Sequence, residues 1–155
     1  MPPSSPAHWL KTVSDGVLST TLPGGTAFGI PEYICESPLT PGYVILCMTD
    51  LSRAVHNLSN HDGASVMVKS SSTEGSLVTN PRVTLIGTLK VVEQEDREAV
   101  RKAYVDVHAD TRHWVNWADF RFYELKVESL YFVGGFGGQH YIGPVSRELY
   151  LSARP

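Results

Sequence analysis

The chain has 155 residues, 42% of them hydrophobic, and a formal net charge of −3 at pH 7. This length supports one well-buried core and is too short for two comfortable domains. The low net charge and the scattered placement of the 13 Lys and Arg residues give no electrostatic case for binding nucleic acid or an anionic membrane surface. Any anion site must therefore be local.

The sequence carries no sign of secretion or of a membrane anchor. Cys35 and Cys47 lie in apolar, strand-like surroundings and are expected to be buried thiols rather than a disulfide framework. The first residues lack the basic start and apolar run of a signal peptide, and no segment approaches the roughly twenty apolar residues of a membrane span. As written, the sequence predicts a cytoplasmic protein that binds neither membrane nor nucleic acid.

Residues 1–15 are expected to form an N-terminal leader with a short helix, and residues 16–155 one folded domain. The leader is rich in Pro and Ser before a helical stretch near residues 7–13. The start of the domain is rich in β-forming residues and predicts a strand, and residues 27–35 predict a second. Pro31 inside this second strand indicates an edge, a bulge or a break, because proline has no N–H to donate to a ladder.

Residues 49–58 lie between two apolar, strand-like runs and predict a short helix. The free backbone N–H groups at its start, the hydroxyl of Ser52 and the guanidinium of Arg53 together suit a phosphate. The alternative is an ordinary N-cap by Asp50 or Ser52. The residues alone leave both interpretations open.

Residues 82–91 form the clearest predicted strand, with one apolar face and a polar face that carries Arg82. An amphipathic helix over residues 94–108 is expected to cover the sheet. Residues 120–133 predict one long strand or two bent strands that lead into the Gly-rich segment around Phe136. This segment lacks the spacing of a nucleotide-binding loop and predicts a tight turn. The exposed ring of Phe136 either packs against a flat ligand or fills a core gap.

These elements predict a mainly β fold: a barrel or highly curved antiparallel sheet of six strands, with one amphipathic covering helix and short helices. Six strands barely close a barrel. The open face that carries Arg82 is therefore expected to meet a second copy of the chain. The sequence predicts a homodimer.

Metal and hydrolytic chemistry find no support in the motifs. The six histidines show none of the spacings of a zinc site, and no serine lies in a nucleophile elbow. Trp114 and Trp117 flank a short segment that either cradles a ring system or anchors a core or an interface. No metal ligand and no catalytic residue is nominated from these patterns.

Six short motifs follow one another in a specific order over roughly residues 16–150. They are Gly29-Ile30-Pro31-Glu32-Tyr33, Ser37-Pro38-Leu39, Asn57-Leu58, Leu85-Ile86-Gly87-Thr88-Leu89-Lys90-Val91, Phe122-Tyr123-Glu124-Leu125 and Phe136-Gly137-Gly138. With them the chain resembles the FMN-binding split barrels of the pyridoxamine 5'-phosphate oxidase-like superfamily, and within it the CREG-type branch. The resemblance implies a homodimeric six-stranded split barrel whose cofactor pocket is completed by the partner subunit.

In flavin-binding members of that superfamily, a Ser-Arg-Lys run at the start of the short helix holds the FMN phosphate. Ser52 and Arg53 match its first two positions, whereas Ala54 stands in place of the lysine. Arg82 is expected to compensate across the barrel, and the flavin ring is expected to lie along the second strand between apolar walls. The cofactor-binding residues nominated in this way are Thr49, Ser52, Arg53, Arg82, Pro31, Glu32, Trp117 and Phe136.

The leading expectation is an FMN-binding protein that is a flavin-dependent oxidoreductase if it is an enzyme. The C-terminal Arg-x-His signature of a true pyridoxamine phosphate oxidase is missing. HugZ-type haem-degrading proteins share the barrel and use a C-terminal histidine on iron; His140 lies in a comparable place, although their His-Thr pair is here Ala54-Val55. Haem is thus an alternative cofactor. The third interpretation is a CREG-like interaction protein without flavin.

Overall fold

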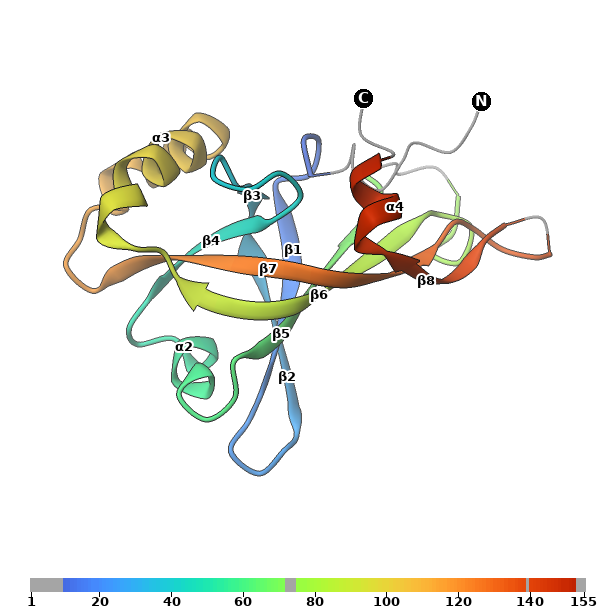
Figure 1. Cartoon of the computed structure of the whole chain (residues 1–155), viewed down its shortest axis with the longest axis horizontal. Coiled ribbons are helices and arrows are strands. Elements are labelled where there is room, and N and C mark those ends of the chain that lie inside the picture. The colour runs from blue at the N-terminus through green and yellow to red at the C-terminus, as the bar shows by residue number, and fades with distance from the viewer. Residues whose placement is uncertain (1–9, 72–74, 139, 153–155) are drawn as a thin grey trace.

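The computed structural model describes residues 10–71, 75–138 and 140–152 (Figure 1). Its strands form one antiparallel sheet in the order β2-β1-β5-β6-β7-β4-β3, with β8 paired to β7. The strands are β1 Asp15–Thr21, β2 Ala27–Tyr33, β3 Cys35–Glu36, β4 Val44–Thr49, β5 Gly63–Lys69, β6 Arg82–Val91, β7 Phe120–Val133 and β8 Ile142–Ser146. The helices are α2 Arg53–Leu58, α3 Arg97–Val107 and α4 Arg147–Ser152, with the 3-10 turns η1 Gln94–Asp96 and η2 Ala109–His113.

The mainly β antiparallel fold is confirmed, but the expected number of six strands is wrong for the described residues, where the sheet has eight. The two additional strands are β3 and β8. β3 has only two residues, too few to show an alternating pattern. β8 contains Gly143 and Pro144, which weaken a strand signal; Pro144 is tolerated because β8 pairs only with β7.

The N-terminal prediction lies largely outside the described part of the chain. Of the helical stretch expected near residues 7–13, residues 7–9 are not described and residues 10–12 form a turn. Leu10 is only 4% exposed and belongs to the main core. The division into a leader over residues 1–15 and a domain over residues 16–155 stays a prediction.

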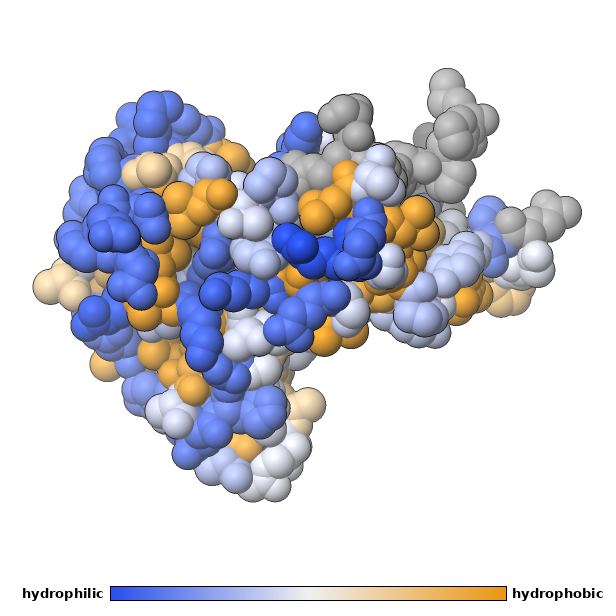
Figure 2. Space-filling view, viewed as in Figure 1, coloured by the Kyte–Doolittle hydropathy of each residue, from blue (hydrophilic) through white to orange (hydrophobic). Residues whose placement is uncertain are grey.

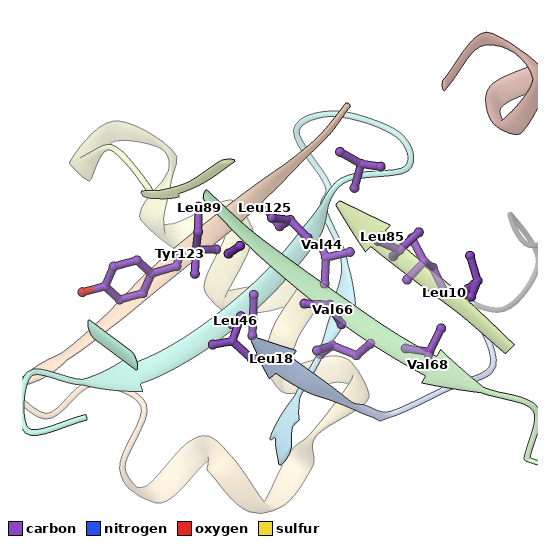
Figure 3. Close-up of a cluster of buried hydrophobic side chains, with 14 of the residues drawn as sticks. Leu10, Leu18, Val44, Leu46, Val66, Val68, Leu85, Leu89, Tyr123 and Leu125 are labelled. Carbon is purple, nitrogen blue, oxygen red and sulfur yellow. The ribbon is translucent and has the colours of Figure 1, made fainter. Parts of the chain in front are cut away.

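The sheet curls into a barrel that is split along one seam. β2 lies at one end of the strand order and β4 lies near the other, yet the two strands pack against each other. No ladder of backbone hydrogen bonds joins them among the described residues. The barrel interior is filled by branched apolar side chains from opposite walls, and Figure 3 shows Leu18, Leu46 and Val66 converging there.

A second apolar cluster lies outside the barrel, under α3. Val100 and Tyr104 of α3 pack with Cys47 of β4 and Phe122 of β7. The outward side of α3 is hydrophilic, as Figure 2 shows by its blue surface. The predicted amphipathic covering helix is therefore confirmed, and it covers the β4 side of the sheet.

β7 is one strand, and a bulge separates its two halves. The register with β6 shifts between Ile86, opposite Ser129, and Gly87, opposite Val127. β7 therefore contributes one extra residue, Glu128, at this point. A Cβ at Gly87 would lie 1.8 Å from the carbonyl oxygen of Lys126, so the backbones approach too closely for any other residue.

The register also defines an outward surface of β5 to β8, here called the open face. Successive rows across this face run through Ser65, Ile86, Ser129 and Ser146; through Met67, Thr84, Tyr131 and Pro144; and through Lys69, Arg82, Val133 and Ile142. No helix of the described chain makes its main contacts with this surface. The open face is therefore the exposed counterpart of the barrel core.

Candidate functional site

The turn between β4 and α2 is closed by hydrogen bonds within the chain. Thr49 Oγ1 donates to Asp119 Oδ2 at 2.7 Å and accepts from the backbone N–H of Leu51 at 3.2 Å. Asp50 Oδ1 accepts from Arg121 Nε at 2.9 Å. The nominated Thr49 is thus already engaged in holding this turn.

The start of α2 itself is open. Ser52 occupies the N-cap position with extended backbone, but it makes no side-chain capping hydrogen bond. Because the Asp50 carboxylate pairs with Arg121, neither candidate residue caps the helix in the way the ordinary N-cap interpretation expects. Arg53 is exposed, and no hydrogen bond or ion pair engages its guanidinium within the described chain. The phosphate interpretation stays a prediction.

Pro31 and Glu32 lie beside this turn rather than in it. They line a pocket of about 440 Å³ together with Cys47 of β4, Tyr104 of α3 and Trp114. Burial raises the pKa of the Glu32 carboxyl. Its environment is therefore drier than that of a surface carboxylate.

A row of aromatic rings connects this pocket to the β4–α2 turn. The Trp114 and Phe120 rings are 4.7 Å apart between centroids, and Trp117 meets Phe120 edge-on at 6.1 Å. Phe120 pairs with Thr49 in the ladder between β4 and β7. Six of the eight nominated residues therefore lie along one side of the barrel: Thr49, Ser52, Arg53, Pro31, Glu32 and Trp117.

Arg82 and Phe136 lie elsewhere. β5 begins near the end of α2, whereas Arg82 pairs with Lys69, the last residue of β5 and six positions beyond Gly63. At about 3.3 Å per residue this places Arg82 roughly 20 Å along the sheet. Arg82 Nη1 donates to the carbonyl oxygens of Leu77 at 2.9 Å and Asn80 at 3.4 Å. Within one protomer, Arg82 is not brought to Arg53.

Phe136 follows β7 at this same distant end. The strand ends at Val133, opposite Arg82, and the turn to β8 follows directly. Phe136 is 71% exposed, so the alternative that its ring fills a core gap is wrong. The ring is available to a ligand or to another protein surface.

A pocket that the motifs did not indicate lies on the open face at this end. It has a volume of about 470 Å³ and is here called the open-face pocket. Its walls include the apolar side chains of Met67, Tyr131 and Val133, and Lys69 and Arg82 supply two cations. The alternation of β5 and β7 predicts that these side chains face outward, but only the register shows that they are neighbours.

His140 lies in the turn between β7 and β8, two residues before β8 begins. A Cβ at Gly135 would lie 2.9 Å from the His140 ring, so the imidazole rests closely over that glycine. The rings of His56, His61 and His108 form hydrogen bonds with backbone groups. In the described part of the chain, only the rings of His113 and His140 have no hydrogen-bond partner.

The two thiols belong to the cluster under α3 and show no activation. Burial raises the pKa of both Cys35 and Cys47 to about 12, so both are neutral thiols at physiological pH. Cys47 nevertheless borders the pocket of Pro31 and Glu32. The expectation that both cysteines are buried free thiols is confirmed.

Two searches bear on other kinds of site. Within residues 10–71, 75–138 and 140–152, no three or more His, Cys, Asp or Glu side chains gather in a way that could hold a metal ion. Over the same residues, no helix combines the length and apolar character needed to span a membrane.

Comparison with known proteins identifies the family. The family described as CREG, beta-barrel matches residues 7–152. The chain belongs to this family. The match confirms the resemblance to the CREG-type branch of the split barrels, including the fold that the resemblance implied.

Relatives of the CREG beta-barrel chain include proteins named for haem. The chloroplastic haem oxygenase HOZ of Arabidopsis thaliana is 27% identical over 161 residues, which cover 97% of this chain and 47% of that protein. The chain thus spans about half the length of this curated relative.

Solved structures of the same fold carry similar descriptions. A haem-binding protein from Mycobacterium smegmatis aligns with a TM-score of 0.83 at 24% identity, covering 98% of this chain and 61% of that one. ChuZ from Campylobacter jejuni aligns at 0.77 and 14% identity, covering 92% and 58%. HutZ, described as the haem storage protein of Vibrio cholerae, aligns at 0.59 and 15% identity, covering 88% and 90%. These likenesses show the fold.

Proposed function

We propose that this protein binds haem at the open-face pocket. One feature carries the proposal: an apolar floor, two cations and a turn with an unengaged histidine lie at the same end of the sheet. Haem is a flat apolar ring with two carboxylates and an iron that accepts an imidazole ligand. The relative HOZ is named a haem oxygenase, and proteins of the same fold are described as haem-binding or haem storage proteins.

The residues present fit the parts of such a group. Met67 and Tyr131 would contact the ring, and Lys69 and Arg82 would pair with its carboxylates. His140 would supply the iron ligand, because its ring nitrogens carry no hydrogen bond in the described structure. Bound haem would supply redox chemistry at iron, while the chain supplies orientation and charge.

A homodimer would join the two groups of candidate residues. Within one protomer, Arg53 and Arg82 lie at opposite ends of the sheet. A two-fold axis across the open face would turn the second copy around, so that Arg82 of the partner subunit approaches the α2 end. Exposed apolar residues on the open face, Ile86 and Tyr131, favour such an interface.

FMN is the second candidate, favoured by the open start of α2. The guanidinium of Arg53 and the hydroxyl of Ser52 are free of the capping and pairing contacts that would occupy a purely structural helix start. The hydroxyl of Thr49 is less suited, because Asp119 already accepts its proton. A flavin would therefore depend on Ser52 and Arg53 for its phosphate.

Titration of the purified full chain with haemin tests the proposal. A Soret band that saturates is expected, and His140→Ala should shift the band and weaken binding by about tenfold or more, as loss of a strong polar contact does. His113→Ala is the matched control, since its ring is also without a partner but lies in η2. The proposal fails if the wild-type spectrum does not change, or if both variants behave alike. Flavin absorbance bands in the protein as purified would favour the FMN candidate.

A further inference from the structure

The pocket beside β2 plays no part in the proposed haem site. It lies between β2, β4 and α3, and it shares no lining residue with the open-face pocket. Asp15 and Glu32 contribute two carboxylates to its wall, whereas none of the described residues that line it is basic. The pocket is thus acidic and has no cation of its own.

Neighbouring cations are committed elsewhere. Arg97 is the basic residue that acts on Cys47, but its Nη2 donates to the carbonyl oxygen of Val115 at 3.2 Å, and its guanidinium lies 5.1 Å from the centre of the Phe122 ring. Glu32 has no ion pair within the described chain, and burial raises the pKa of its carboxyl. The charge of Glu32 is therefore left to solvent or to a ligand.

Tyr104 gives an independent sign of a ligand site. Its side chain lines the pocket and is only 1% exposed. No group of the described chain forms a hydrogen bond with its hydroxyl, although its ring is fixed against His108 at 4.9 Å and Phe122 at 5.5 Å. A buried hydroxyl without a partner is unusual in native proteins. A polar ligand atom in the pocket would satisfy it.

Aromatic rings form the remaining walls. Tyr33 stacks on His108 with centroids 4.4 Å apart and donates its hydroxyl proton to Asp110 at 3.2 Å, so its orientation is fixed. Trp114 is held against Phe120. Aromatic faces next to unpaired carboxylates attract organic cations through the ring quadrupole and by direct charge attraction.

We propose that the pocket between β2, β4 and α3 binds an organic cation, namely a primary ammonium attached to an apolar or aromatic body. The ammonium group donates hydrogen bonds to Glu32 and to the hydroxyl oxygen of Tyr104. The apolar body lies against Trp114 and Tyr33. This site is independent of haem binding.

Calorimetric titration of the full chain with 2-phenylethylammonium tests this site, with 2-phenylethanol as the neutral compound of matched shape. The ammonium is expected to bind and the alcohol to bind at least about tenfold more weakly, because only the former makes charge-assisted hydrogen bonds. Glu32→Gln should lower the affinity for the ammonium by about tenfold or more, and Tyr104→Phe by a smaller factor. Glu95→Gln removes an exposed carboxylate in η1 and should change nothing.

Thermal unfolding separates lost binding from lost folding. Glu32→Gln is expected to unfold at the same or a higher temperature, because it removes a charge that burial disfavours. Absence of binding by the wild-type chain at millimolar ammonium, equal binding of the alcohol, or unchanged affinity in a folded Glu32→Gln variant would each overturn the proposal.

Discussion

The two ends of the barrel sheet differ in how their polar groups are used. At the α2 end, the side chains of Thr49 and Asp50 bond to Asp119 and Arg121, and the turn is closed within the chain. At the β7–β8 end, the His140 ring has no hydrogen-bond partner in the described chain and Phe136 is exposed. The first end carries the stronger sequence signal, whereas the second has the more available chemistry.

This difference teaches that a motif of ligand-binding residue types can be largely consumed by its own fold. Hydroxyls, an acid and an arginine gather at the β4–α2 turn, but only Ser52 and Arg53 remain uncommitted there. At the other end, the binding groups come from three strands and become neighbours only through the register. Substitutions at both ends and at the bulge between them can break or sharpen this contrast.

The largest effect is expected from a charge on the open face. If this face is the dimer interface, Ile86→Asp buries an unpaired carboxylate there, which costs about 3–5 kcal/mol and dissociates the dimer. Leu51→Asp is the matched control, because Leu51 is 82% exposed at the α2 end, whereas Ile86 is 41% exposed. Sedimentation velocity should give a monomer for the first variant and a dimer for the second. Equal masses for both variants would remove the distinction between the ends.

The next effect concerns the bulge. Gly87→Ala places a methyl group 1.8 Å from the carbonyl oxygen of Lys126, where the backbone must move. We expect a loss of unfolding free energy of about 3 kcal/mol, at the upper end of overpacking effects. Gly24→Ala is the control, since a Cβ there meets nothing within 4 Å. Urea denaturation measures both variants, and equal midpoints would show that the bulge relaxes easily.

The smallest effect compares two residues of the α2 end. Thr49→Val leaves Asp119 without its donor and should lower the unfolding free energy by about 1–2 kcal/mol. Ser52→Ala removes no capping hydrogen bond and should stay within about 0.5 kcal/mol of the wild type. Urea denaturation at constant salt resolves the pair. If Ser52→Ala destabilised as much as Thr49→Val, Ser52 would be structural and the helix start would not be open.

Much of the fold is predictable because its signals are local. The alternation of Tyr123, Leu125 and Val127 identifies β7, and the periodicity around Val100 and Tyr104 identifies α3. β3 and β8 were missed because two paired residues have no periodicity and because Gly143 and Pro144 mask a strand. Pairing with β7 overrides these weak preferences.

The candidate sites were less predictable because their parts meet through tertiary structure. Arg82 was expected to act with Arg53, but the distance between them follows from the register of β5 and β6, which no motif reveals. Met67 and Tyr131 carry no motif at all and become pocket walls only as neighbours across β6. Tyr104 reads as a core residue of an amphipathic helix, and its unpartnered hydroxyl becomes visible only once β2 is placed against α3.

The bulge at Glu128 also determines which side chains face the ligand. Before it, odd-numbered residues such as Leu125 enter the barrel; after it, even-numbered Leu130 and Phe132 do so. Deleting Glu128 alone would shift the phase of the rest of the strand, turning Tyr131 inward and Phe132 outward. The chemical identity of the open face is therefore encoded in the length of β7 as much as in its composition.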